Sequence, residues 1–424
     1  MRSTRIAVGV TIVAAALGFA FAAVSTNDFV QHLDRQVHGL HCSFLPGVDE
    51  ADVTGESGCH VTLMSPYSSF LRESVWGGVP IALLAMAVFA FLFAWGCVVL
   101  LMRRDTDPRV TGFTALSWVL PVLSSVVMGT ISLSTLGAAC KLCIGIYAAS
   151  GVGFLAALVS FALARRRRTS ALPEPVDADA SSTAPLPLVV RPLGWGALAG
   201  AFGAGVLFVV VPVVAYAAAA PEFERYVGSC GELADASDPQ GALIPLGPQT
   251  RPVPVLEVLD PLCPACRGFE NRLAASSVPA QASRRILLFP LDDTCNWMVN
   301  RAIHPGACAI SEAVICADEE AEEVIAWAFE NQERIVEAAG EDPDAAADMA
   351  RARFPTLADC IGSPRAQAQL NASLRWAVQN ELPVLTPQVY VGDARLCDAD
   401  TDLGMDFALT RLVDRHRAGG EGTP

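Results

Sequence analysis

The stretch GAACKLCIGIYAASG (residues 137–151) places two cysteines, Cys140 and Cys143, at the head of a long apolar run. The run continues to Ala164 and is followed by four consecutive arginines, 165–168. About 20 apolar residues suffice to cross a bilayer, so this pattern predicts a transmembrane helix with a Cys-x-x-Cys pair at one end. Such a spacing is typical of redox disulfides and of zinc sites.

Apolar segments of this length recur along the chain of 424 residues, of which 52% are hydrophobic. The predicted spans are 6–24, 77–102, 110–136, 139–164 and 193–217. For the first span a cleaved signal peptide is the alternative, because a basic start precedes the apolar run and small residues follow it. We therefore expect a multi-pass α-helical protein in a lipid bilayer.

Arginines indicate which side of the membrane each loop faces. They gather before the first predicted span, between the second and third at 103–109, and between the fourth and fifth at 165–168 and 191. Arginine in short loops marks the cytoplasmic side. The N-terminus is therefore predicted inside, and Cys140, Cys143 and everything after Tyr216 outside a cell (inner) membrane.

Composition divides the chain further. Residues 169–192 are rich in Pro, Ala, Ser and Asp without apolar periodicity, which is typical of a flexible linker. The predicted order is a four-span unit (1–168), a cytoplasmic linker (169–192), a fifth transmembrane helix (193–217), a connector (218–250) and a C-terminal domain (251–418). From Pro221 onward, 32 acidic residues stand against 16 arginines, which argues against nucleic acid as a partner.

The C-terminal domain opens with VPVLEVLDPLCPACRGFE (253–270). A strand is expected at 253–259, then a turn and a helix that starts at Cys263. A cysteine in the first turn of a helix meets unpaired N–H groups and the positive end of the dipole, so its pKa falls below about 8.5. A further strand is expected after Thr386-Pro387, and helical stretches at 307–337 and 344–379. The pattern indicates an α/β domain with helices covering a sheet.

The alternative for Cys263 and Cys266 is half of a zinc site, but no second Cys-x-x-Cys or Cys-x-x-His follows in the domain. Together with Thr386-Pro387, the pair resembles a thioredoxin-fold domain of the disulfide-exchange branch with a helical insertion. In that family the proline is cis and lies against the dithiol, which implies this role for Pro387. The stretches FPLDDTCN, HPGAC and ICADEE resemble the thioredoxin-like domains that are fused to membrane quinone oxidoreductases.

A second set of residues lies in the four-span unit. Loop cysteines Cys42 and Cys59 are followed by Ser65 before the second span, and Tyr147 comes one helical turn after Cys143. In this order the residues resemble the vitamin K epoxide reductase family over roughly 1–165. The resemblance implies a membrane quinone of the ubiquinone, menaquinone or phylloquinone type, and four catalytic cysteines: Cys42, Cys59, Cys140 and Cys143.

The resemblance also implies separate roles within this set. Cys143, one turn deeper, would face the quinone, and Cys140 would exchange with the loop pair. Ser65 and Tyr147 would offer hydroxyls to the quinone oxygens. The alternative for Ser65 is a helix cap, and for Tyr147 an aromatic side chain at the membrane interface.

Neighbouring residues leave further alternatives. Lys141, the only lysine, either favours the thiolates beside it or extends toward the interface. His41 and His60 each adjoin a loop cysteine, so a Cys/His metal site is the alternative there. No further ligand pair lies in the loop, and no metal is expected.

Six more cysteines lie in the C-terminal part and allow fifteen pairings. On a shared helix Cys308 and Cys316 would be about 12 Å apart, beyond the roughly 7 Å limit between the Cα atoms of a disulfide. Each is therefore expected to pair elsewhere. Structural bridges are the expected use, with a second redox pair as the alternative, for Cys230, Cys295, Cys308, Cys316, Cys360 and Cys397.

These resemblances imply an enzyme, a quinone-dependent thiol-disulfide oxidoreductase that generates disulfides. Thiols of reduced exported proteins would reduce Cys263–Cys266, and electrons would pass through the loop pair and the membrane pair to a quinone. One alternative is an enzyme that runs in the reverse sense and reduces a quinone epoxide or disulfides. No cytoplasmic dithiol or nucleotide motif that could supply the electrons is visible in the sequence, which argues against it. The other is a membrane-anchored thioredoxin-like chaperone or isomerase without redox turnover. The three dithiol pairs predicted on one side of the membrane argue against it.

Overall fold

The computed structural model describes residues 2–36, 38–42, 57–170 and 192–420. By their internal contacts they divide into two compact units. The membrane unit comprises Met1–Phe70 and Val79–Ala220, and the α/β unit comprises Leu71–Gly78 and Pro221–Pro424. The linker predicted at 169–192 falls almost entirely outside the described residues.

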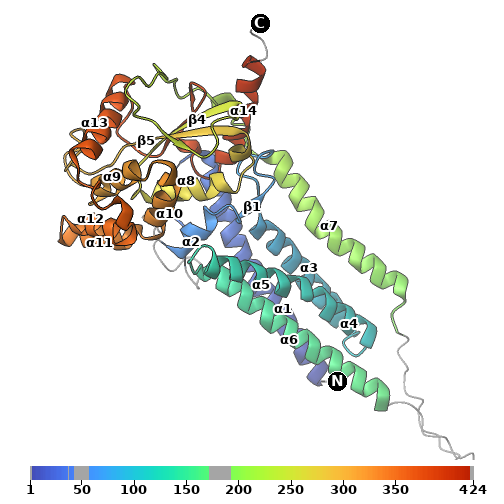
Figure 1. Ribbon diagram of the computed structural model, residues 1–424. Coiled ribbons are helices and arrows are strands. Elements are labelled where there is room, and N and C mark those ends of the chain that lie inside the picture. Colours follow the sequence, from blue (N-terminus) through green and yellow to red (C-terminus); the bar gives the residue numbers. More distant parts are fainter. Residues whose placement is uncertain (1, 37, 43–56, 171–191, 421–424) are drawn as a thin grey trace, which may run out of the picture. The chain divides into compact units, whose positions relative to one another are not determined.

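Long apolar helices build the membrane unit (Figure 1). Among the described residues, five helical stretches are long and apolar enough to cross a membrane, which confirms the five predicted spans. The third stretch is broken at Trp118, because Pro121 has no N–H to donate to the Ser117 carbonyl and its ring crowds that carbonyl. The helices are α1 (Arg2–Gln31), α3 (Ile81–Leu101), α4 (Pro108–Ser117) with α5 (Val119–Ser134), α6 (Lys141–Ser170) and α7 (Trp195–Ala219).

Helix α1 packs along α3 and α6, and α6 also contacts α4 and α5. Aromatic rings meet small residues in this core: Phe89 and Trp118 lie edge to face, 6.0 Å between ring centroids, among Ala14, Ala15 and Ala157. Small side chains allow helices to approach closely, which matters in a membrane because burial from lipid supplies little hydrophobic driving force. This packing fixes the position of the head of α6 against α1.

Short elements follow α1 in the membrane unit. Helix α2 (Gly58–Leu63) begins after Ser57, whose side chain accepts a hydrogen bond from the backbone N–H of His60 at 3.2 Å. Strands β1 (Ser69–Phe70) and β2 (Val79–Pro80) pair antiparallel and lead into α3. The segment between them, Leu71–Gly78, belongs to the α/β unit, where the buried Trp76 packs edge to face on Phe407.

A five-stranded sheet with the order β3-β5-β4-β6-β7 forms the centre of the α/β unit. Helix α8 (Pro264–Ala274) connects β4 to β5, which run parallel, and the other neighbouring strands are antiparallel. Both the strand predicted at 253–259 and the helix predicted after it are confirmed. The strands are β3 (Ile244–Leu246), β4 (Val253–Leu259), β5 (Ala282–Leu288), β6 (Gln388–Val391) and β7 (Ala394–Arg395).

A helical insertion separates β5 from β6 (Figure 1). It breaks up the stretches predicted at 307–337 and 344–379: Asp318 has a φ of 50° after the first helix, and Pro355 follows another helix that it cannot continue. With the strand order, the insertion gives a thioredoxin fold and confirms the predicted fold class. The helices are α9 (Ala307–Ala317), α10 (Ala321–Glu330), α11 (Gln332–Glu341), α12 (Ala345–Arg353) and α13 (Pro364–Gln379), and α14 (Met405–Gly420) follows the sheet.

Three disulfides lie in the α/β unit: Cys230–Cys397, Cys295–Cys308 and Cys316–Cys360. Cys308 and Cys316 share α9 and pair with different segments, as their separation along a helix predicts. The two bridges therefore fasten both ends of α9 to the chain before and after it. Cross-links of this kind stabilise a fold mainly by restricting the unfolded chain.

Candidate functional site: two dithiols and an apolar cavity

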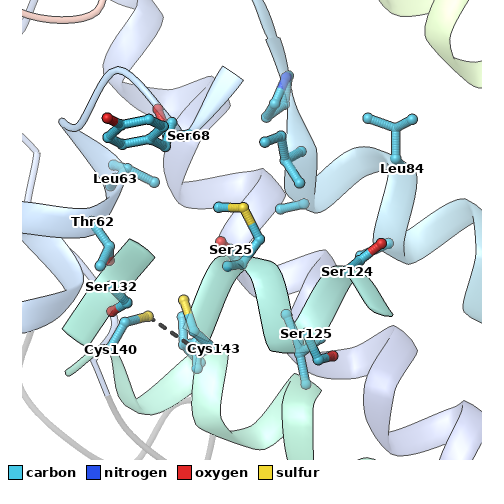
Figure 2. Close-up of a pocket in the computed structure, with 18 of the residues that line it drawn as sticks. Ser25, Thr62, Leu63, Ser68, Leu84, Ser124, Ser125, Ser132, Cys140 and Cys143 are labelled. Atoms are coloured by element: carbon cyan, nitrogen blue, oxygen red, sulfur yellow. Dashed lines mark hydrogen bonds between the residues drawn. The ribbon is translucent and has the colours of Figure 1, made fainter. Parts of the chain in front are cut away.

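Two free thiols stand at the start of α6. Cys140 is the last residue before the helix, and Cys143 lies in its first turn. The backbone N–H of Cys143 donates to Sγ of Cys140 at 3.2 Å (Figure 2). Cys140 is only 4% exposed. Cys140 is therefore accessible to a neighbouring sulfur or to a molecule within the bundle and hardly to bulk water, whereas Cys143 is only partly buried.

The loop pair lies against this dithiol. Cys42 and Cys59 form a disulfide with their Cα atoms 5.7 Å apart, and Cys59 is buried in the first turn of α2. Cys59, Cys140 and Leu142 form one buried cluster, against which Cys42 and Cys143 pack. The structure thus brings together the four cysteines singled out in the sequence of the membrane unit.

Glycine at position 58 permits this approach. A Cβ on Gly58 would come within 3.0 Å of the carbonyl oxygen of Ala139, closer than real Cβ atoms approach other atoms. Ala139 directly precedes Cys140, and Gly58 directly precedes Cys59. The absence of a side chain at 58 therefore lets α2 lie against the turn that leads into α6.

A cavity of about 580 Å³ adjoins the cluster within the membrane unit (Figure 2). Cys59, Cys140 and Cys143 line it, together with many apolar side chains of α1, α3, α5 and α6. Its polar groups are mostly hydroxyls, and Figure 2 shows those of Thr62 and Ser132 on the side where the two thiols lie. An apolar cavity with a few polar groups is the usual form of a small-molecule site.

Both hydroxyl residues predicted to contact a quinone, Ser65 and Tyr147, line this cavity. The Ser65 hydroxyl donates to the carbonyl of Thr62 at 2.8 Å, so its proton is engaged at the end of α2 in the manner of the helix-cap alternative. Tyr147 lies one turn after Cys143 and faces Gly129 of α5. Its ring is therefore inside the bundle between α5 and α6.

One charged residue of the cavity lining, Asp28, was not singled out from the sequence. The apolar run ends near residue 24, but α1 continues to Gln31, so the only acidic residue of this helix lies in its last turn, beyond the apolar run. Its Oδ1 pairs with Nδ1 of His41 at 2.8 Å, and its Oδ2 accepts the backbone N–H of His41 at 3.0 Å. The signal that could have revealed it is an acid one helical turn past Ser25, close behind a run of apolar and small residues at 6–26.

The second dithiol lies in the α/β unit. Cys263 is the N-cap of α8, Cys266 lies one turn further, and both are buried. The hydrogen bond from Cys266, with a smaller contribution from Thr386, outweighs burial and lowers the pKa of Cys263 to about 6. Burial raises the pKa of Cys266 well above its usual value. One thiol is therefore ionised near neutrality and the other is protonated.

The loop before β6 lies over this dithiol. The Thr386–Pro387 peptide bond is cis, and Sγ of Cys263 lies 3.6 Å from the carbonyl oxygen of Thr386. Pro387 is thus adjacent to the residue whose carbonyl contacts Cys263. This matches the position that the resemblance to the thioredoxin family implies for it.

A second acid–histidine pair lies beside Cys263. Asp260 is fully buried and accepts from Nδ1 of His304 at 2.7 Å. Burial alone would lower the pKa of His304, but Asp260 and the Cys263 thiolate outweigh it and raise that pKa. His304 belongs to the HPGAC stretch, and its charged form stabilises a thiolate at Cys263.

The described residues contain no group of three or more His, Cys, Asp or Glu side chains placed to hold a metal ion. Of the two histidines beside loop cysteines, His41 is paired with Asp28, and the backbone N–H of His60 donates to Ser57. Lys141 is exposed at the start of α6. The chemistry that this arrangement supports is sulfur exchange.

Comparison with known proteins gives a family match for the first part of the chain. Residues 10–163 match the model of the vitamin K epoxide reductase family. A comparison with curated proteins finds no match. Solved structures similar to this chain include the oxidoreductase DsbA from Xylella fastidiosa (22% identity, 41% of this chain and 91% of that chain, TM-score 0.31). Another is reduced DsbA1 from Neisseria meningitidis (17% identity, 45% of this chain and 100% of that chain, TM-score 0.30).

The assignment of the second part rests on its own strand order and its dithiol at a helix start. The first part combines the family match with four cysteines gathered at one end of a helical bundle. Residues 10–163 therefore form a vitamin K epoxide reductase family domain, which this chain joins to a thioredoxin-fold domain.

Proposed function

We propose that this protein is a membrane disulfide-generating oxidoreductase that passes electrons from thiols of exported proteins to a membrane quinone. Cys263 and Cys266 receive the electrons from client thiols, Cys42 and Cys59 carry them onward, and Cys140 and Cys143 deliver them. All six cysteines face the extracytoplasmic side of the inner membrane in this proposal. The relay is a series of thiol–disulfide exchanges, in each of which a thiolate attacks a disulfide sulfur.

One observation carries the proposal: the Cys42–Cys59 disulfide and the Cys140/Cys143 dithiol lie in one buried cluster that borders a large apolar cavity. Exchange between the two pairs needs sulfurs in contact, which the cluster supports. The buried member of the loop pair, Cys59, is the better placed to exchange with Cys140. Cys42 is less buried and is therefore assigned the exchange with Cys263.

The α/β unit suits the first exchange. With a pKa of about 6, Cys263 is mostly thiolate at neutral pH and is a good leaving group when a client thiol attacks the disulfide. Joining both units in one chain raises the effective concentration of one pair at the other. Pro387 and the Thr386 carbonyl limit access to the Cys263 side of the pair.

The cavity fits a quinone in size and in polarity. Its volume of about 580 Å³ lies within the usual range of 300–1,000 Å³ for small-molecule sites. Tyr147 is the hydroxyl residue best placed to donate to a quinone oxygen near the thiols. The Ser65 and Ser132 hydroxyls donate to the backbone carbonyls of Thr62 and Ala138, so they can accept but not freely donate. When bound, a quinone takes up two electrons and two protons. Cys143, at the cavity wall, is assigned the contact with it.

The test uses purified full-length protein in lipid nanodiscs, a reduced client peptide and a short-chain quinone. Wild type should form quinol and peptide disulfide in equal amounts. Cys143→Ala should abolish quinol formation and leave exchange between the peptide and Cys263–Cys266 unchanged. Cys97→Ala, at a free cysteine of α3 outside the cluster, is the matched control and should behave as wild type. Quinol formation by Cys143→Ala at the normal rate would contradict the assignment.

A further inference from the structure

Proton supply is a separate requirement of the proposed relay. Thiol–disulfide exchange transfers electrons without protons, because a thiolate attacks and a thiolate leaves. When Cys59 reduces the Cys140–Cys143 disulfide, the pair gains two electrons, and burial favours uptake of protons over two adjacent thiolates. Until the disulfide has reformed and quinol has been made, two protons in total are taken up on the cavity side, at the dithiol or at the quinone. These must reach a mostly apolar cavity in which Cys140 is only 4% exposed.

Asp28 is the charged residue that connects this cavity with the loop outside. It lines the cavity, and its side chain is only 3% exposed. Ser25, one turn earlier on the same face of α1, also lines the cavity (Figure 2). A buried carboxylate beside an apolar cavity is costly unless it is paired, and Asp28 is paired with His41.

His41 gives Asp28 a route to solvent. Its Nδ1 lies 2.8 Å from Oδ1 of Asp28, whereas 39% of its side chain is exposed and it does not belong to the cavity lining. An imidazole passes protons readily because it accepts at one nitrogen and donates at the other. We propose that His41 and Asp28 form the proton path from the outside solution into the cavity, which deepens the proposed quinone-linked function and rests on it.

The transfer can be written with each proton accounted for. Protonated His41 gives its Nδ1 proton to Oδ1 of Asp28 and is left as a neutral imidazole, which solvent reprotonates at the exposed nitrogen. Asp28, now a carboxylic acid, releases the proton on the cavity side and returns to the carboxylate. Two such cycles supply the two protons that each two-electron turnover consumes.

Other ionisable groups lie near Asp28 and His41 and could also exchange protons with Asp28. Nδ1 of the buried His32 is bonded to the backbone carbonyl of Asp28 at 2.8 Å, so this nitrogen is not directed at the Asp28 carboxylate. Tyr67 and Tyr147 face the cavity, as do the thiols of Cys140 and Cys143. None of the hydrogen bonds within the described residues joins these four side chains to the Asp28 carboxylate, which leaves His41 as its bonded partner.

A purely structural role is the rival explanation, since Asp28 also holds the backbone beside Cys42 through the His41 N–H. Asp28→Asn separates the two roles: its amide oxygen can still accept that N–H, but the side chain no longer carries a proton between sites. His41→Ala removes the imidazole and leaves the backbone N–H in place. The exposed pair Asp34 and His38, also joined at 2.8 Å but outside the cavity lining, supplies the matched control Asp34→Asn.

The experiment measures quinol formation in a single turnover of pre-reduced full-length protein in nanodiscs from pH 5 to 9. Asp28→Asn should be slowed about 10²-fold, the low end for loss of a proton-transfer group, and more at high pH, where protons are scarce. Asp28→Glu should recover most of the rate. His41→Ala should be slow and should be accelerated by added imidazole. Asp34→Asn should match wild type.

Reduction of the Cys42–Cys59 disulfide through Cys263 and Cys266 is followed separately, in samples of the same variants that are oxidised beforehand, contain no quinone and receive a reduced peptide, and it should stay within about twofold of wild type. If quinol formation and reduction of the Cys42–Cys59 disulfide were slowed equally, Asp28 would have a structural role only, and the proposed proton path would be wrong. Normal quinol formation by Asp28→Asn at every pH would also overturn it, while leaving the proposed function intact. If wild type itself forms no quinol, the proposed function is wrong, and the proposed proton path is wrong with it.

Discussion

Gly58 lies against the backbone of Ala139, so that the residue before Cys59 touches the residue before Cys140. A Cβ at 58 would meet a carbonyl group, not the flexible end of a side chain, so α2 would have to move away from the head of α6. The distance between two exchanging sulfurs therefore depends on a missing side chain. This relationship can be tested directly.

Gly58→Ala should slow exchange between the loop pair and the α6 pair by about 10²-fold, the usual effect of displacing a reacting group by about 1 Å. Rapid acid quenching followed by thiol labelling and gel separation measures this step. Gly151→Ala is the control, because a Cβ at that position in α6 meets nothing within 4 Å. An unchanged exchange rate in Gly58→Ala would show that the close approach of α2 is not required.

The low pKa of Cys263 predicts a pH profile for its alkylation. In reduced protein the rate with iodoacetamide should rise with a midpoint near pH 6 instead of about 8.5. At pH 7 the thiolate fraction should then exceed that of an ordinary cysteine by about 30-fold. Mass spectrometry of the peptide that contains Cys263 follows the reaction. A midpoint near 8.5 would contradict the assigned thiolate.

The same pKa fixes the sign of a stability effect. Because the folded pKa lies below the unfolded one, the thiolate stabilises the reduced α/β unit fully above about pH 8.5, and this contribution is lost as pH falls through about 6. The Cys263–Cys266 disulfide should therefore be more oxidising at pH 8 than at pH 5 when compared with an unperturbed dithiol. Equilibration with glutathione buffers of known ratio at the two pH values measures it.

His304→Gln should shift the alkylation midpoint of Cys263 upward. Protonated His304 is attracted to the thiolate, and its removal leaves the buried Asp260 carboxylate without that cation. His38→Gln, at an exposed histidine of the membrane unit, is the control. A midpoint that does not move in His304→Gln would show that the hydrogen bonds at the start of α8 alone determine the thiolate.

The spans and the dithiols could be predicted from the sequence because strong constraints govern them. Bilayer thickness sets the length of an apolar run, and Cys140 and Cys143 stand at the head of such a run. The strand at 253–259 and the helix after Cys263 follow from local residue patterns. The sequence does not decide between a helix cap and a quinone contact for Ser65, because both roles require a hydroxyl before the second span.

The remainder depends on contacts that a linear pattern does not contain. The run at 110–136 is uncharged throughout, and its break at Trp118 follows from one proline. Ala- and Glu-rich residues favour helix on both sides of Asp318, so packing of the buried Ala317 and Ala321 decides where α9 ends. Asp28 could not be placed from the sequence because it follows the apolar run and resembles a loop residue. Only the continuation of α1 to Gln31 brings it to the cavity wall.

Membrane orientation remains a prediction that rests on arginine placement. In intact cells a membrane-impermeant maleimide should label reduced Cys263 and should not label a cysteine introduced by Ser170→Cys. The same reagent added after permeabilisation should label both, which controls for reactivity. Labelling of Ser170→Cys in intact cells would reverse the assigned sidedness.

The order of transfer between the pairs can be trapped. In the double variant Cys59→Ala/Cys266→Ala, each remaining partner lacks its resolving thiol, so a mixed disulfide between Cys42 and Cys263 should accumulate. Cys42 is the less buried member of its pair and Cys263 the ionised member of its own, so these two sulfurs should react first. After proteolysis in the 169–192 linker, the two halves should stay joined on a non-reducing denaturing gel and separate when reductant is added. The variant Cys42→Ala/Cys266→Ala, in which the buried Cys59 is the remaining loop thiol, should give far less of the joined species. Separation of the halves without reductant, or a mapped bond between Cys263 and Cys140, would overturn the proposed order.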